Sequence, residues 1–234
     1  TDVDFTSIIT GTDLYILELA SGQIAELTTD SVASATTITA AVTGVTSGST
    51  YKIRKASTVS SIFGDAATSE LAGSATGNIN EADVVLIPDG AGGFTRVFRL
   101  TAGGAEQYLT SNFGDGNLPI VYTDGILVQK RNASQELTVT GEVRSGSTVL
   151  ALNSGFNYVS TSYPVGSTLA NSGLAASLTG SATGNINEAD VVFVPDGSGG
   201  YNRYFYLTAT GAESWLSSSF SAGDDVPLTS GIII

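Results

Sequence analysis

The stretch Gly-Ser-Ala-Thr-Gly-Asn-Ile-Asn-Glu-Ala-Asp-Val-Val at residues 73–85 recurs without a change at residues 180–192, an offset of 107 residues. Similarity extends beyond it, because 73–98 and 180–205 share 20 of 26 positions. A period of this length is too long for one rung of a solenoid and suits a whole β domain. The sequence therefore predicts an internal duplication of domains.

Each copy carries the signals of a β-hairpin. The apolar run at 84–87 is followed by the turn Pro-Asp-Gly-Ala-Gly-Gly at 88–93, in which proline fixes φ and glycine supplies positive φ. A returning strand follows at 94–100. We therefore expect hairpins over 83–100 and 190–207.

The rest of the chain also favours strands. Runs at 14–17, 36–39, 51–54 and 137–140 are β-branched or alternating, and Gly, Ser, Asp and Asn bound them. Helical signals are limited to single turns at 104–109 and 211–216. The predicted fold class is all-β, with tandem duplicated β-sandwich or barrel-like domains built from short hairpins. The expected parts are an N-terminal β segment at 1–56, a first repeat at 57–144 and a second repeat at 145–234.

A shorter motif marks equivalent points of the repeating unit. Thr-Asp-Leu-Tyr-Ile-Leu at 12–17 resembles Thr-Asp-Gly-Ile-Leu-Val at 123–128 and Thr-Ser-Gly-Ile-Ile-Ile at 229–234. An apolar edge strand without nearby charge is an aggregation hazard. The last strand is therefore either internal to its own sheet or paired with the N-terminal strand of another copy. The second arrangement predicts a head-to-tail interface formed by Leu14, Ile16, Ile232, Ile233 and Ile234.

Composition excludes several classes of function. The chain has a net charge of -13, and it contains no Cys, Met or His. Disulfides, Cys/His zinc sites and Ser-His-Asp triads are therefore excluded, and so few cations argue against nucleic-acid binding. No apolar stretch is long enough to span a membrane. With 28 Gly, only 13% charged residues and neither Cys nor Met, the chain is expected to be an exported bacterial protein, extracellular or on the cell surface.

One set of motifs resembles a known family. Ala-Asp-Val-Val-x-x-Pro-Asp-Gly-x-Gly-Gly-[Phe/Tyr]-x-Arg-x-Phe, Gly-Ile-Leu-Val-Gln-Lys-Arg at 125–131, Leu-Thr-Val-Thr-Gly-Glu-Val at 137–143 and Tyr-Lys-Ile-Arg-Lys-Ala at 51–56 carry the resemblance. Together they are similar to an uncharacterised family of secreted β-rich repeat proteins from Verrucomicrobia and related bacteria. The resemblance implies export and a β-rich fold. It implies no activity and no catalytic residue.

The acidic turns are the first candidates for chemistry. Glu81 and Asp83, and likewise Glu188 and Asp190, could form a carboxylate pair of the kind that glycosidases use, but a duplicated turn is commoner than a duplicated catalytic centre. We expect these side chains to bond turn backbone. Calcium binding is the weaker alternative, with ligands Asn78, Asn80, Asp83, Asn185, Asn187 and Asp190. No cofactor is expected.

Aromatic residues of the second copy are the other candidates. Tyr204 and Tyr206 share one face of a predicted strand, and Trp215 follows. They are candidates for a glycan or protein contact, with core packing as the alternative. The leading hypothesis is a non-catalytic, exported structural protein that binds copies of itself head to tail in a filament or surface layer. The alternative hypothesis is a glycan-binding adhesin module that recognises surface glycans.

Overall fold

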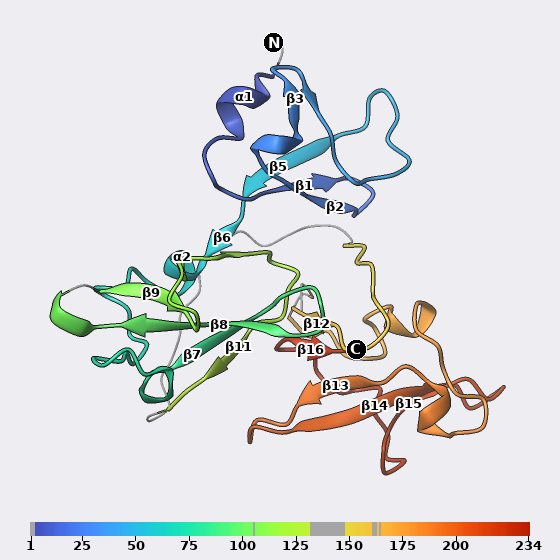
Figure 1. The fold of residues 1–234 in the computed structure, drawn as a ribbon. Helices are drawn as coiled ribbons and strands as arrows, with labels where there is room; N and C mark the ends of the chain where they lie inside the picture. The colour runs from blue at the N-terminus through green and yellow to red at the C-terminus, as the bar shows by residue number, and fades with distance from the viewer. Residues whose placement is uncertain (1–2, 105, 132–147, 161–162, 164) are drawn as a thin grey trace. The chain divides into compact units, whose positions relative to one another are not determined.

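The computed structural model describes residues 3–104, 106–131, 148–160, 163 and 165–234 (Figure 1). Antiparallel strands dominate it, and the two α-helices, α1 (Phe5–Ile8) and α2 (Val59–Phe63), are a single turn each. The predicted all-β class is confirmed. The sheets are open, and the described residues form no closed barrel. No helix in the described part is long and apolar enough to cross a membrane.

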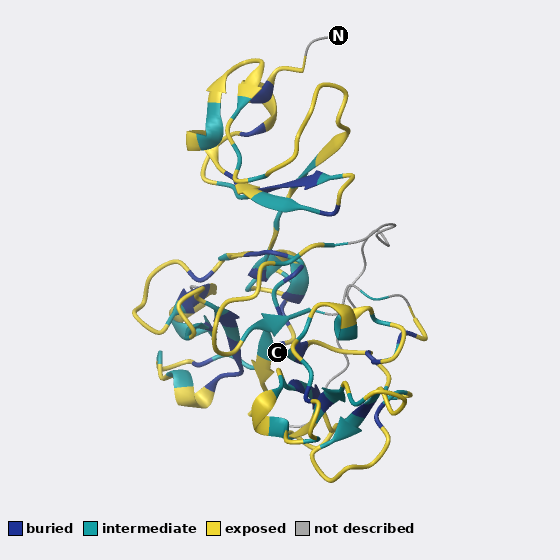
Figure 2. Cartoon of the chain, turned by 90° about the vertical axis from the view of Figure 1, so that its right-hand side faces the viewer, coloured by how far each residue is buried: buried dark blue, intermediate teal, exposed yellow. Residues whose placement is uncertain are grey.

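The chain divides into two compact units. The first comprises Thr1–Ile87, Thr95–Tyr122 and Leu127–Ala151, and the second Pro88–Phe94, Thr123–Ile126 and Leu152–Ile234. The strand expected at 137–140 and the expected boundary between 144 and 145 lie outside the described residues. Figure 2 shows that buried residues gather along the strands, whereas most connecting loops are exposed.

The N-terminal sheet belongs to the first unit. Its central strand β1 (Tyr15–Leu19) pairs antiparallel with β2 (Ile24–Leu27) and with β5 (Tyr51–Lys55). Residues on both faces of β1 are buried, as expected for a strand between two others. A small hairpin of β3 (Val32–Ser34) and β4 (Thr37–Ile38) accompanies this sheet. Its core contains Ile9, Tyr15, Leu17 and Leu27.

The first repeat forms a four-stranded sheet. Its strand order is β11 (Leu127–Gln129), β7 (Val84–Pro88), β8 (Phe94–Leu100) and β9 (Gln107–Thr110). The predicted hairpin over 83–100 is β7 and β8. A two-stranded ladder of β6 (Ser57–Thr58) and β10 (Pro119–Ile120) leads into α2.

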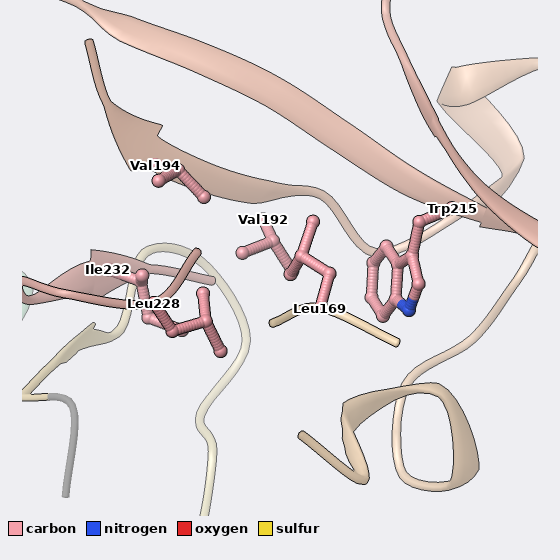
Figure 3. Packing of buried hydrophobic residues seen from close by; sticks show 6 residues of the cluster. All are labelled: Leu169, Val192, Val194, Trp215, Leu228 and Ile232. Carbon is pink, nitrogen blue, oxygen red and sulfur yellow. The ribbon is translucent and has the colours of Figure 1, made fainter. Parts of the chain in front are cut away.

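The second repeat forms a five-stranded sheet in the second unit. Its strand order is β12 (Tyr158–Val159), β16 (Ile232–Ile233), β13 (Val192–Pro195), β14 (Tyr201–Leu207) and β15 (Ser214–Ser217). The core beneath it consists of Leu169, Val192, Val194, Trp215, Leu228 and Ile232 (Figure 3). Burying each large apolar side chain contributes about 1.5–3 kcal/mol.

Corresponding elements follow in the same order in both repeats. The 3-10 turns η2 (Ile79–Glu81) and η5 (Ile186–Glu188) precede β7 and β13, and the same ladder follows each turn. The helical turns expected at 104–109 and 211–216 are wrong, because the second half of each segment, 107–109 or 214–216, belongs to the strand β9 or β15. Tyr108 and Trp215, with Leu109 and Leu216, pair with the preceding strand. Pairing and burial override a weak local preference.

The last strand lies inside its own sheet. Ile233 is opposite both Tyr158 of β12 and Phe193 of β13, and Ile232 is 2% exposed. The internal arrangement left open by the sequence is therefore the one observed. Ile16 is likewise 2% exposed on a central strand.

Candidate ligand-binding site

The duplicated acidic turns begin with an asparagine cap. The Asn78 side-chain oxygen accepts a hydrogen bond from the Asn80 N–H at 3.0 Å, and Asn185 accepts one from the Asn187 N–H at 3.1 Å. Such Asx turns satisfy the first donors of a short helical turn. Both turns are thus built by the same local bond.

The aspartate that follows each turn clamps an upstream segment. Asp83 Oδ2 accepts the Ala72 N–H at 2.7 Å, and Asp190 Oδ2 accepts the Thr179 N–H at 2.8 Å. In each case the aspartate N–H donates to the carbonyl of the same partner residue. The expected side-chain bonds to backbone are present for Asn78, Asn185, Asp83 and Asp190.

The glutamates bind hydroxyl groups of their own turns. Glu81 Oε2 accepts from Thr76 Oγ1 at 2.7 Å, and Glu188 Oε2 accepts from Thr183 Oγ1 at 2.6 Å. The bond from Thr183 is the main reason why the pKa of Glu188 lies below its usual value. Among the described residues no group of three or more His, Cys, Asp or Glu is placed to hold a metal ion. The glutamate oxygens therefore help to build the turns, and the calcium alternative stays a prediction.

The expected aromatic platform is mostly internal. Trp215 is 1% exposed and packs with Tyr206, with ring centroids 5.4 Å apart. Tyr204 and Tyr206 are half-buried against the same core. Figure 3 shows the indole ring beside Leu169 within this cluster. These three residues do not form one exposed face.

Two other aromatic residues, Phe113 and Phe220, are exposed at equivalent positions. Their side chains are 63% and 65% exposed, and both have φ of 62°. Among the described residues they are the non-glycine residues with positive φ. A left-handed conformation costs a residue with a side chain about 1–2 kcal/mol, and bulky residues rarely adopt it. Such an outlier is a reason to look for a function.

Backbone hydrogen bonds within each turn stabilise the left-handed conformation of Phe113 and Phe220. The Phe113 N–H donates to the Thr110 carbonyl at 2.9 Å, and the Thr110 N–H donates to the Gly114 carbonyl at 3.0 Å. Phe220 occupies the same place in a turn closed between Ser217 and Ser221. A residue near αL is required at this point of such a turn, and glycine or asparagine usually supplies it.

Neighbouring residues fix the orientation of the exposed rings. The Phe113 ring is edge-on to Phe98, with centroids 6.1 Å apart at 88°, and Phe220 stands in the same relation to Phe205. A Cβ added at Gly77 would lie 3.4 Å from Phe113 Cε1, so the ring lies close to the preceding turn. Each ring is thereby held by one edge and keeps most of its surface in solvent.

A pocket beside the Phe113 ring lies wholly within the first unit. The open pocket has a volume of about 490 Å³ and is formed by α2 and the residues just after it, by strand β9, and by the turn that follows β9. Its lining residues are Ser60, Asp65, Ala66, Gln107, Tyr108, Leu109, Phe113, Asp115 and Asn117.

Hydrogen bonds hold part of this lining rigidly. Asn117 Oδ1 accepts the Ser60 N–H at 2.9 Å, and Asp115 Oδ1 accepts the Asn117 N–H at 2.9 Å. The Tyr108 hydroxyl donates to the Gly64 carbonyl at 2.8 Å, while burial raises the pKa of that hydroxyl. These bonds join the α2 segment to the turn across the pocket.

The remaining groups suit a polar ligand with an apolar face. Asp65 and Gln107 are exposed at the rim, and their side chains can accept, or accept and donate, hydrogen bonds. The Phe113 ring offers an apolar surface beside them. Sequence reasoning missed this site, although the equal offset of the two phenylalanines after matching strands was a usable signal.

In the comparisons with known proteins, no family model, curated protein or solved structure matches the chain.

Proposed function

We propose that the chain is a non-catalytic, exported protein of duplicated β domains that binds a glycan in the pocket beside Phe113. The observation that carries the proposal is a strained, exposed aromatic ring beside a polar pocket. A sugar ring has an apolar C–H face that can stack on an aromatic ring, and hydroxyl groups that pair with carboxylate and amide groups. The extracellular or cell-surface location expected from composition is consistent with such a ligand.

The structural role of the carboxylates in the duplicated turns supports a binding function over a catalytic one. The carboxylates of the duplicated turns hold backbone and hydroxyl groups of their own turns. The pocket adds a rigid wall through the Ser60–Asn117 bond, which lowers the ordering cost of binding. We place the ligand contacts at Phe113, Gln107 and Asp65.

An array of oligosaccharides and polysaccharides, probed with the labelled chain, tests this proposal. Saccharides that bind are then titrated by calorimetry against the wild type and two single variants. Phe113→Asn should weaken binding at least tenfold, equivalent to about 1.4 kcal/mol, because asparagine fits the turn but removes the ring. The matched variant Phe220→Asn should bind as the wild type does. Absence of any binding saccharide, or equal loss in both variants, contradicts the proposal.

Self-association is the second candidate function. The observation that favours it is the recurrence of an exposed apolar ring at one place in both repeats, which gives each chain two equivalent contact points. The filament or surface layer expected from the sequence would then form through these rings, because Ile16 and Ile232 lie within their own sheets. Sedimentation at high concentration and electron microscopy decide this: a monomer without filaments contradicts it, and polymers lost in a double Phe113→Asn and Phe220→Asn variant support it.

A further inference from the structure

The pocket beside Phe113 carries negative charge. Asp65 and Asp115 both line it, and both residues are exposed. Among the described residues that line the pocket, none is a lysine or an arginine. A ligand therefore meets two carboxylates on a chain whose net charge is already -13. This field repels an acidic saccharide and attracts a cationic one.

Both carboxylates keep hydrogen-bonding capacity for a ligand. Asp115 Oδ1 accepts the Asn117 N–H at 2.9 Å, whereas no donor within the described residues reaches its Oδ2. The Asp65 side chain accepts no hydrogen bond from the described part of the chain. Burial is the main cause of the raised pKa of the Tyr108 hydroxyl, and the charge of Asp65 raises that pKa further. The Asp65 charge thus acts on the pocket wall.

The arginine that acts on the same wall is bound to other groups. The charge of Arg99 lowers the pKa of the Tyr108 hydroxyl, against the larger effect of burial. Its guanidinium donates to Glu106 Oε2 at 2.9 Å and to the carbonyls of Ser69 and Leu71 at 2.8 and 3.1 Å. Arg99 is therefore paired with Glu106, and the charges of the pocket carboxylates remain for a ligand.

The second repeat keeps the exposed ring but not the carboxylate after it. Ala222 is the counterpart of Asp115, because Leu216 is opposite Ala222 as Leu109 is opposite Asp115. Both turns nevertheless hold an exposed phenylalanine with positive φ. An alanine thus fits the same bridge, so the turn does not require the charge of Asp115. This charge distinguishes the pocket of the first repeat rather than the shared architecture.

We infer that the pocket selects saccharides that carry a protonated amine, such as oligomers of glucosamine. The ammonium group would pair with Asp65 and Asp115, while the apolar face of the sugar stacks on Phe113. Charge-assisted hydrogen bonds are about twice as strong as neutral ones, and an ammonium group is also attracted to the face of an aromatic ring. The inference rests on the proposed function and adds the class of saccharide to it.

Three matched oligosaccharides test this selectivity. They are the β-linked tetramers of glucosamine, N-acetylglucosamine and glucose, which share a backbone and differ in one substituent on each ring. Each is titrated by calorimetry in a buffer of low ionic strength that keeps the amine protonated. The wild type should bind the glucosamine tetramer about fivefold more tightly than either neutral tetramer, equivalent to about 1 kcal/mol, the upper value for an exposed ion pair. Added salt should reduce this preference.

Charge-removing variants locate the groups that select the amine. In a double Asp65→Asn and Asp115→Asn variant, the side-chain acceptor for the Asn117 N–H is kept. Its preference for glucosamine should fall below about twofold, while its binding of the neutral tetramers stays close to that of the wild type. Glu26→Gln removes an exposed charge of the same unit outside the pocket. This control should retain the full preference.

The outcomes separate failure of this inference from failure of the proposed function. Neutral saccharides that bind at least as tightly as glucosamine, and lose binding in Phe113→Asn, overturn the charge selectivity but support the glycan site. A glucosamine preference that survives in the double variant also overturns the inference, because other groups must then recognise the amine. Absence of binding by every saccharide contradicts both.

Discussion

Lys130 Nζ lies 2.5 Å from Asp83 Oδ2, and the carboxylate has no exposed surface. The pair links the end of β11 to the residue before β7, which are 47 residues apart in sequence. The Ala72 and Arg131 N–H groups complete the bonding of the carboxylate. The first repeat is thus closed by an ion pair between a buried carboxylate and a partly exposed lysine.

Removing only the cation should destabilise the first unit strongly. Lys130→Ala leaves Asp83 buried without its counter-ion, and breaking such a pair costs about 3–5 kcal/mol. Urea unfolding followed by circular dichroism measures this loss. Lys52→Ala, an exposed lysine on β5, is the control and should change stability by less than about 0.5 kcal/mol. A loss no larger than that of the control would refute a structural role for the pair.

Acid should weaken the first unit through Asp83. Burial alone would raise the pKa of this carboxyl, but the bonds from Lys130, Arg131 and Ala72 outweigh it and hold the pKa below its usual value of 3.8. A carboxyl whose folded pKa is lowered contributes stability above its unfolded pKa, and this contribution is lost as the pH falls through the folded value. Stability should therefore decline below about pH 4. Asp83→Asn should be less stable at pH 7 and show a flatter decline; an unchanged slope would argue against the assignment.

Because β16 lies inside its sheet, Ile233→Lys should destabilise the second unit. A lysine there would stand beside Phe193 and Tyr158 in the five-stranded sheet, so we expect the second unit to lose about 1–3 kcal/mol. Trp215 fluorescence in urea is the measurement. Val165→Lys, at a fully exposed valine of the same unit, is the matched control and should be neutral. Equal stability of the two variants would mean that β16 does not belong to that sheet.

Phe113 should contribute little to stability despite its size. Phe113→Asn loses the edge-on contact with Phe98 but relieves a left-handed phenylalanine, and the two effects of about 1 kcal/mol each nearly offset one another. By contrast, Phe98→Ala should cost about 3–5 kcal/mol, because Phe98 is 2% exposed. Comparable losses in the two variants would show that Phe113 is a core residue rather than a surface one.

The sequence predicted the β-hairpins correctly, because interactions between residues close in sequence determine them. The hairpins follow from an apolar run, a Pro-Asp-Gly turn and a returning strand, and Asp89 Oδ1 indeed accepts the Ala91 and Gly93 N–H groups. Periodicity, however, indicates a strand without naming its neighbours. The sheet position of Ile232–Ile233 and the burial of Trp215 therefore depended on contacts distant in sequence.

The pocket illustrates the same limit for function. It combines residues 60–66 with residues 107–117, and no spacing in the sequence predicts that these two segments lie side by side. Phe113 became a candidate only when its positive φ and its exposure were seen together. The duplicated acidic turns are conspicuous in the sequence because they are repeated. Their side chains hold the same local structure in both repeats.

Hydrogen–deuterium exchange with and without a binding saccharide tests the central claim most directly. The proposed site predicts slower exchange in residues 107–117, including the turn that carries Phe113, and unchanged exchange in the matching residues 214–224 of the second repeat. Phe113→Asn should abolish the protection at the same saccharide concentration. Protection of 214–224 instead, or protection of 107–117 that survives Phe113→Asn, would contradict the account.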